Sequence, residues 1–331
     1  MKKRWSDMRR VLGLVVLASA ISLGLAAEGR CADWAPSKPV EFVVPAGPGG
    51  GSDVFARTAA GIVEAEKLSP VPFVVVNRPG GNAIVGMTQV AQQKGNPHTL
   101  LTYHSGQVVG PLSAGTEIAT YPNFTFLASI AIDEELLFVK TDSPFKSLRD
   151  LVKAAPERGG SITVGGTTTG QDDHICNRLL ENAAKIKLRY VSFNSGGEAL
   201  TALLGGHVEV IWANPAEVAP QLEAKQVRAL ALAREERLSY LPDAPTFKEQ
   251  GFDVTWKMFR GIVAPAGIPK EAVSFYENMF KRLKDTSAWK EGYLKKYMLT
   301  PSWMGHEELT KYVALQEQTS KAILKDLGIL K

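Results

Sequence analysis

A glycine-rich loop, Pro45–Asp53, constrains the fold of this chain more than any other segment. It follows Val40–Val44, an apolar and largely β-branched run typical of a strand. After the loop, apolar residues recur with helical spacing on one face: Phe55, Ala59, Ile62 and Val63. A strand, a glycine loop and a helix in this order are typical of α/β folds.

The composition of the loop predicts an anion site. Gly47, Gly49, Gly50 and Gly51 allow sharp turns and let a ligand approach the backbone closely. A helix that begins at Ser52 or Asp53 leaves N–H groups free in its first turn, at the positive end of its dipole. Those groups favour an anion. A tight turn without a ligand is the alternative interpretation.

Two nucleotide-binding motifs are excluded at this loop. A phosphate-binding loop ends in Gly-Lys-Ser/Thr, whereas this loop ends in Gly51-Ser52-Asp53. A dinucleotide fingerprint needs a third glycine, and Ser52 occupies that place.

The N-terminus has the pattern of a secretory signal peptide over residues 1–32. Five basic residues precede Val11–Ala27, an uncharged apolar stretch, and such leaders are removed from the mature protein. We predict cleavage after Ala27 or Ala32, and therefore a periplasmic protein. An uncleaved membrane anchor is the alternative, although the stretch is at the short limit for a span.

Charge and cysteine content argue against several classes of partner. Residues 1–32 carry six basic and two acidic side chains, so their net charge equals the +4 of the whole chain. The remainder is neutral, and we expect no nucleic-acid partner.

Cys31 and Cys176 are too few for a disulfide framework, and the sequence leaves open whether they pair. His207-Val208-Glu209 lacks the cysteines of a deaminase zinc motif, and we expect neither metal nor cofactor.

The body of the chain alternates short apolar runs with helical patterns, which predicts α/β architecture with largely parallel sheets and two domains. The expected strands cover residues 40–44, 73–76, 99–102, 136–139, 162–165, 189–191, 208–212 and 227–232. Besides the helix after the first loop, the expected helices cover residues 149–155, 173–185, 198–204, 215–224, 270–285 and 307–327.

Polar loops follow several of these strands, and ligands of α/β sheets bind beyond the carboxyl ends of strands. These loops contain many neutral hydrogen-bonding groups. His104 beside Ser105 is the one candidate pairing of a base with a nucleophile, and neighbouring residues at a strand end usually point to opposite sides. The loops therefore indicate binding more than catalysis.

The chain resembles the substrate-binding proteins of tripartite tricarboxylate transporters, the TctC or Bug proteins, from about Pro39 to Gly328. The motifs are KPVEFVVPAGPGGGSD, VVNRPGGNAIVG, GGHVEVIWANPAEVAPQLEAKQVRALALA, PDAPTFKEQGF and GIVAPAGIP. The resemblance implies a type II Venus-flytrap fold with two domains, each a mostly parallel sheet flanked by helices. We expect residues 33–132 and 259–331 to form one domain and residues 133–258 the other.

The resemblance also implies the binding residues. Matching the family's loops residue by residue, and adding the polar residues at strand ends, gives Pro45, Gly49, Gly50, Gly51, Ser52, Gly81, Asn82, Tyr103, His104, Ser105, Thr167, Thr168, Thr169, Gln171, Asn194, Asn214 and Arg260. The threonines at 167–169 depart from the family's usual serine. We assign Asp53 and His174 to loop structure. Arg260 is expected to pair with a distal carboxylate of the ligand, or else with Asp253 or Glu135.

These observations predict a periplasmic solute-binding protein without catalytic residues. It would capture an organic carboxylate, with di- or tricarboxylates favoured, and deliver it as a monomer to a membrane permease of large and small subunits. A secreted α/β enzyme acting on a small acid, and a sensor that presents its ligand to a receptor, are the alternatives.

Overall fold

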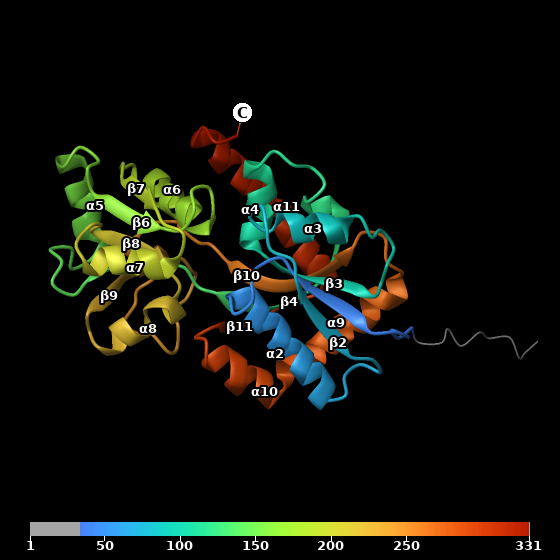
Figure 1. The fold of residues 1–331 in the computed structure, drawn as a ribbon. Helices are drawn as coiled ribbons and strands as arrows, with labels where there is room; N and C mark the ends of the chain where they lie inside the picture. The colour runs from blue at the N-terminus through green and yellow to red at the C-terminus, as the bar shows by residue number, and fades with distance from the viewer. Residues whose placement is uncertain (1–33, 331) are drawn as a thin grey trace, which may run out of the picture. The chain divides into compact units, whose positions relative to one another are not determined.

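The computed structural model describes residues 34–330. The predicted leader, its cleavage sites and Cys31 lie outside these residues. The described chain forms two sheets flanked by helices (Figure 1). We call the six-stranded sheet with its helices the first lobe, and the five-stranded sheet with its helices the second lobe.

The first lobe has the strand order β11-β4-β10-β3-β1-β2. Its strands are β1 (Val40–Val44), β2 (Phe73–Asn77), β3 (Thr99–His104), β4 (Phe124–Asp133), β10 (Met258–Pro265) and β11 (Thr300–Met304). Its helical segments are α2 (Gly51–Ala65), α3 (Ile84–Ala91), α4 (Ser105–Ser113), η1 (Tyr121–Asn123), α9 (Lys270–Asp285), α10 (Ser287–Trp289), η3 (Lys290–Lys295) and α11 (His306–Asp326). Strand β1 is parallel to β2 and β3, so their carboxyl ends meet at one edge.

The second lobe has the strand order β7-β6-β8-β5-β9. Its strands are β5 (Leu136–Lys140), β6 (Thr163–Gly166), β7 (Arg189–Ser192), β8 (Val210–Ala213) and β9 (Val227–Leu232). Its helical segments are α5 (Leu148–Glu157), α6 (Asp172–Ala184), α7 (Gly196–Leu204), α8 (Pro215–Glu223) and η2 (Lys248–Gln250). Strand β6 is parallel to β7 and β8, which again brings three carboxyl ends to one edge.

The predicted α/β class is confirmed, and each predicted strand is present within one or two residues of its bounds. The sheets are mixed rather than largely parallel, because β10 and β11 run antiparallel to β4, and β5 runs antiparallel to β8 and β9. Strands β4, β10 and β11 were not predicted. Strand β11 contains Pro301, which is tolerated because this strand lies at the edge of its sheet.

The chain passes from the first sheet to the second between β4 and β5, and returns between β9 and β10. The domain boundaries at residues 132/133 and 258/259 remain a prediction. One buried cluster, which contains Leu148 and Val164 of the second lobe, also includes Val109 of α4 and Leu324 of α11. The hydrophobic core therefore does not divide where the sheets do.

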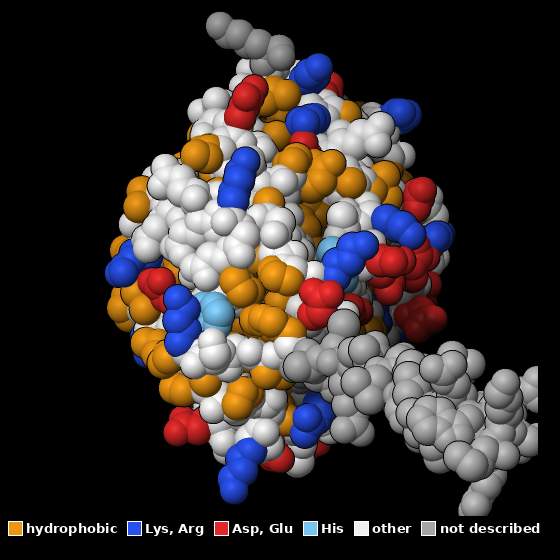
Figure 2. Space-filling view, turned by 90° about the vertical axis from the view of Figure 1, so that its right-hand side faces the viewer, with side chains coloured by type: hydrophobic (Ala, Val, Ile, Leu, Met, Phe, Trp, Pro, Cys, Tyr) orange, Lys and Arg blue, Asp and Glu red, His pale blue; other side chains and the backbone are white. Residues whose placement is uncertain are grey.

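On the face that Figure 2 shows, Lys and Arg are interspersed with Asp and Glu, so neither positive nor negative charge predominates there. This agrees with the neutral balance of the sequence beyond residue 32. None of the helices within residues 34–330 is long and apolar enough to cross a membrane.

Candidate functional site

The glycine loop after β1 leads directly into α2, whose first-turn N–H groups have no partner within the helix. The N-cap residue Gly50 gives no side-chain hydrogen bond to the helix. The first backbone bond of the helix runs from the N–H of Val54 to the carbonyl of Gly50, at 2.9 Å. The N–H groups of Gly51, Ser52 and Asp53 precede this bond and therefore have no partner within the helix.

Asp53 turns back into its own loop. Its carboxylate accepts hydrogen bonds from the N–H of Gly49 at 2.9 Å, from Nε of Arg57 at 3.0 Å and from Nδ2 of Asn77 at 2.9 Å. The hydrogen bond from Arg57 is the main reason that the pKa of Asp53 falls to about 2. Gly49 has φ of +82°, a conformation that favours glycine. The acid therefore organises the loop.

Arg260 lies directly beneath the start of α2. A Cβ at Gly51 would stand 3.0 Å from both terminal nitrogens of the guanidinium, so a larger residue at this position would crowd Arg260. Arg260 is opposite His104 in the β10–β3 pairing, and it forms an ion pair with Asp133. The alternative prediction, that Arg260 pairs with Asp253 or Glu135, is wrong. Its place beneath the loop puts its charge at the near end of the site rather than the distal end.

The loop after β2 packs against the first loop. A Cβ at Gly86 in α3 would stand 2.8 Å from Cβ of Pro45. The two segments can pack this closely because Gly86 has no side chain. Between them, Asn82 and Ala83 both have positive φ, at +53° and +75°. A non-glycine residue rarely adopts this conformation outside specialised loops. The segments that follow β1 and β2 are thus in direct contact.

His104 is the N-cap residue of α4, and its imidazole ring is neutral. Its Nδ1 accepts the N–H of Gly106 at 3.1 Å, and its own N–H donates to Oε1 of Gln107 at 2.8 Å. Burial, reinforced by the charge of Arg260, lowers the pKa of His104 to about 3. Ser105 is fully buried. His104 and Ser105 therefore form no nucleophile–base pair, which removes the observation behind the enzyme alternative.

Tyr103 lies in the hydrophobic core and not in the site. Its side chain is 1% exposed and packs beside Phe126 and Phe259, and its hydroxyl donates to the carbonyl of Gln107 at 3.2 Å. Tyr103, predicted to bind ligand, therefore packs in the core, and the hydroxyl of Ser105 is buried without a hydrogen-bond partner among residues 34–330.

Five of the predicted residues line one cavity of about 310 Å³, together with six that were not predicted. The predicted ones are Pro45, Ser52, Asn82, His104 and Gln171. The others are Ala46, Pro79, Gly80, Ala83, Gly106 and Gln107. The spacing of Gln107, three residues after a helix-starting His104, was a readable capping signal.

The second lobe contributes Gln171 to this cavity, and its Oε1 would stand 2.8 Å from a Cβ at Gly106. The loop before Gln171 is held internally. The N–H of Thr167 donates to Asp173 at 2.6 Å, and the N–H of Gly170 donates to Nδ1 of His174 at 3.1 Å. His174 thus caps the loop, and its ring stacks on Tyr190. Thr168 and Thr169 are exposed and do not line the cavity.

Asn194 and Asn214, both predicted to bind ligand, use their amides locally. Nδ2 of Asn194 donates to Glu198 at 3.1 Å, and Nδ2 of Asn214 donates to the carbonyl of Glu134 at 2.9 Å. Neither residue lines the 310 Å³ cavity. Gly49, Gly50, Gly51 and Gly81 belong to the same loops as its lining but do not line it themselves.

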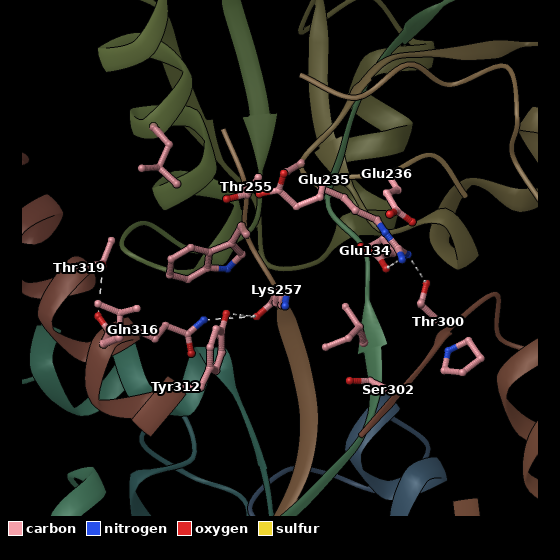
Figure 3. A pocket seen from close by; sticks show the side chains of 17 residues that line it. Glu134, Glu235, Glu236, Thr255, Lys257, Thr300, Ser302, Tyr312, Gln316 and Thr319 are labelled. Atoms are coloured by element: carbon pink, nitrogen blue, oxygen red, sulfur yellow. Dashed lines mark hydrogen bonds and ion pairs between the residues drawn. The ribbon is translucent and has the colours of Figure 1, made fainter. Parts of the chain in front are cut away.

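A larger cavity of about 640 Å³ lies where the chain passes between the sheets (Figure 3). Tyr312 and Gln316 of α11 donate to the carbonyl of Lys257, at 3.4 and 3.3 Å. Arg234 pairs with Glu134 at 2.8 Å. The charged residues of the lining are three acids, Glu134, Glu235 and Glu236, and two bases, Arg234 and Lys257, so acids are in excess, and no glycine loop enters the lining. The smaller cavity is therefore the better anion site.

Comparison with known proteins identifies the family of this chain. A family model described as tripartite tricarboxylate transporter family receptor matches residues 55–329. A protein from the gbd 5′ region of Cupriavidus necator is 28% identical over 96% of each chain. BugT of Bordetella pertussis is 24% identical, over 97% of this chain and 98% of its own.

Solved structures give the same result for the fold. A ligand-free TctC solute-binding protein from Polaromonas has 25% identity and a TM-score of 0.78, over 88% of this chain and 99% of its own. MatC of Rhodopseudomonas palustris with bound malate has 24% identity and a TM-score of 0.70, over 87% of this chain and 99% of its own.

The family and the fold are those of periplasmic receptors and not of enzymes, as the sequence predicted. The match covers both lobes and most of the site's loops. The chain belongs to the receptor family of tripartite tricarboxylate transporters.

Proposed function

We propose that this receptor captures a small organic carboxylate in the 310 Å³ cavity and delivers it to a tripartite tricarboxylate transporter permease of large and small subunits. The observation that carries the proposal is the start of α2, where partner-free N–H groups lie above the Arg260 guanidinium. The bound malate of MatC, which has the same fold, supports a carboxylate as ligand.

The chemistry of this corner suits one carboxylate. Hydrogen bonds to a charged group contribute about 1.5–3 kcal/mol each. Two or three of them, from backbone N–H groups and the Ser52 hydroxyl, supply roughly half or more of the 8 kcal/mol of a micromolar complex. The buried positive charge of Arg260 adds a favourable field, because nearby charges act strongly where water is excluded.

The proposal includes movement of two domains about the crossings near Asp133 and Trp256–Arg260. Both lobes supply residues to the cavity, since Gln171 belongs to the second lobe. A ligand held between them would favour a more compact receptor, as in other periplasmic binding proteins. We propose that the receptor is a monomer. Small-angle scattering with and without a saturating ligand should then show a smaller radius of gyration in the complex.

Calorimetry against carboxylates, neutral sugars and alkylamines tests the binding. We expect one carboxylate per chain and no heat from glucose or butylamine. A preference for either of those would refute the proposal. Uptake of the best-bound carboxylate by cells with and without this gene then tests delivery, because a receptor used for sensing would bind the compound without changing its uptake.

A further inference from the structure

Helix α11 packs in the hydrophobic cores of both lobes. Leu309 and Val313, in its first half, are buried in a cluster formed by residues of the first lobe. Leu324, near its last turn, is buried instead in the cluster that holds the core of the second lobe. At 1.5 Å per residue, Leu309 and Leu324 are about 22 Å apart along the helix axis. One helix therefore connects the two cores, in addition to the two crossings of the chain.

The residues that follow α11 continue this contact with the second lobe. Ile329 and Leu330 are half-buried and pack against the same second-lobe cluster. Their N–H groups donate to the carbonyl of Leu324 at 2.9 and 3.1 Å, which folds this segment back onto the end of the helix. Asp326 forms an ion pair with Arg178 of α6, with 3.4 Å between Oδ2 and Nε. The segment is thus fixed to both α11 and α6.

Two of these side chains lie against the loop that carries Gln171. Gly170, the residue before Gln171, is buried and has φ of +84°. A Cβ at Gly170 would stand 3.4 Å from Cδ2 of Leu324, 3.5 Å from Cδ1 of Ile329 and 3.9 Å from Cβ of Ser113 in α4. These are contact distances for apolar atoms. The backbone of the loop is therefore packed against the end of α11 and the end of α4.

Gln171 extends from this loop over the first turns of α4. Its Oε1 would stand 2.8 Å from a Cβ at Gly106, and its Nε2 would stand 3.8 Å from a Cβ at Gly110. The two glycines are one helical turn apart and lie on the same face of α4. Of the described residues that line the 310 Å³ cavity, Gln171 alone belongs to the second lobe.

The hydrogen bonds of the loop do not fix it relative to the first lobe. Those from Thr167 to Asp173 and from Gly170 to His174 both remain within the second lobe. Leu324 belongs instead to a helix that begins in the core of the first lobe. The packing on Gly170 therefore determines where the loop lies with respect to α4.

We propose that Leu324 and Ile329 are positioning residues for ligand binding, which hold Gln171 at the cavity by packing on Gly170. This inference rests on the proposed function and adds residues outside the cavity that determine its affinity. The amide of Gln171 can donate to a carboxylate. A side chain that is already held in place loses less conformational entropy when the ligand binds.

Calorimetry of Ile329→Ala tests the inference. The probes are malate, the monocarboxylates from acetate to hexanoate and the dicarboxylates from malonate to adipate, and the probe that binds the wild type most tightly is used for all variants. We expect Ile329→Ala to weaken its binding about fivefold, because Gln171 is no longer held in place.

Leu330→Ala is the matched control. Leu330 packs against the same buried cluster but is not among the side chains nearest to Gly170. We expect its affinity to stay within about twofold of the wild type. Urea unfolding of both variants measures the loss of stability that they share.

A double-mutant cycle separates positioning from a general structural effect. Gln171→Ala should weaken binding about tenfold, and adding Ile329→Ala to it should weaken binding no further, because residues that act through one another are not additive. Independent effects would instead multiply to about fiftyfold.

Hydrogen exchange of the unliganded protein gives a measurement that does not depend on the ligand. The N–H of Gln171 donates to the carbonyl of Thr168 at 3.0 Å, and the N–H of Gly170 donates to His174. Both amides should exchange at least about threefold faster in Ile329→Ala and at the wild-type rate in Leu330→Ala, because local packing sets the frequency of local opening.

The possible results separate the two proposals. Wild-type affinity or unchanged exchange in Ile329→Ala, equal effects of the two alanine variants on affinity, or multiplied losses in the cycle would overturn the inference and leave carboxylate binding intact. Absence of binding of every probe to the wild type would overturn the proposed function and this inference together.

Discussion

The cavity edges of the two lobes have the same architecture but differ in the charged groups at their helix starts. At each edge, three parallel strands end in loops that lead into helices. At the first edge the acid Asp53 is neutralised within its loop, and the buried cation Arg260 lies beneath the helix start. At the second edge the helices begin with acids, and Glu135 is buried near them. A helix N-terminus is therefore an anion site only where its own first turn leaves it unoccupied.

The strongest way to break this comparison is to remove the cation of the first edge. Arg260→Ala should lower carboxylate affinity at least 100-fold, about 2.7 kcal/mol. It should also reduce the free energy of unfolding by roughly 3 kcal/mol, because Asp133 remains buried and unpaired. Calorimetry and urea unfolding measure the two effects.

The double variant Asp133→Asn/Arg260→Ala separates these effects. It removes the orphaned charge, so it should recover much of the lost stability without recovering affinity. Wild-type affinity in the double variant would show that Arg260 serves only as an ion-pair partner.

The role of Asp53 gives the next largest effect, on stability. Asp53→Asn should lower the free energy of unfolding at pH 7 by about 2–3 kcal/mol, because charge-assisted hydrogen bonds are lost. The folded pKa of about 2 lies below the ordinary value of 3.8. The contribution is therefore present above about pH 4 and is lost as the pH falls toward 2.

Asp150→Asn is a matched control, since Asp150 accepts hydrogen bonds at the start of α5 but is exposed. Its loss should cost about 1 kcal/mol or less. Equal losses for Asp53 and Asp150 in urea unfolding would mean that Asp53 is an ordinary capping residue.

Two adjacent glycines sharpen the comparison at the first edge. Gly51→Ala places a Cβ 3.0 Å from the Arg260 guanidinium and should weaken carboxylate binding about tenfold, or 1.4 kcal/mol. At Gly50 the nearest atom to a Cβ is 3.8 Å away, so Gly50→Ala should change affinity less than twofold. The reverse order in calorimetric titrations would show that the ligand contacts the Gly50 side of the loop.

The smallest expected change concerns His104. Its folded pKa of about 3 lies below the ordinary 6.5, so the ring should remain neutral between pH 8 and pH 5. In that interval the unfolded chain takes up a proton that the folded chain does not, and stability falls as the pH falls. Imidazole NMR shifts that titrate near pH 6.5 would contradict the buried position of His104.

Local patterns were sufficient for the repeating part of the fold and for the first site loop. Apolar runs predicted eight strands, and the glycines with a following helix predicted the anion corner. The patterns failed for β10 and β11, because Arg260, Gly261 and Pro301 interrupt the alternation expected of a strand. These strands form because neighbouring strands accept their backbone hydrogen bonds, and those neighbours are distant in the sequence.

The candidate site divides in the same way. The loops containing Ser52, Asn82 and His104 were readable from the sequence, since each follows a predicted strand. The burial of Tyr103 in the core was not readable, because it depends on Phe126 and Phe259, which lie on strands distant in the sequence. The same holds for the side-chain amide of Asn214, which donates to the carbonyl of Glu134, 80 residues earlier in the chain.

The sequence by itself determined the strand–loop–helix units, the glycine loop at the start of α2 and the family to which the chain belongs. Only the tertiary structure decided where the charge of Arg260 lies. Arg260 is 207 residues beyond Asp53 in the chain, yet it lies beneath the helix that Asp53 helps to begin. Local residue patterns report backbone conformation, whereas electrostatic fields sum over groups that only folding brings together.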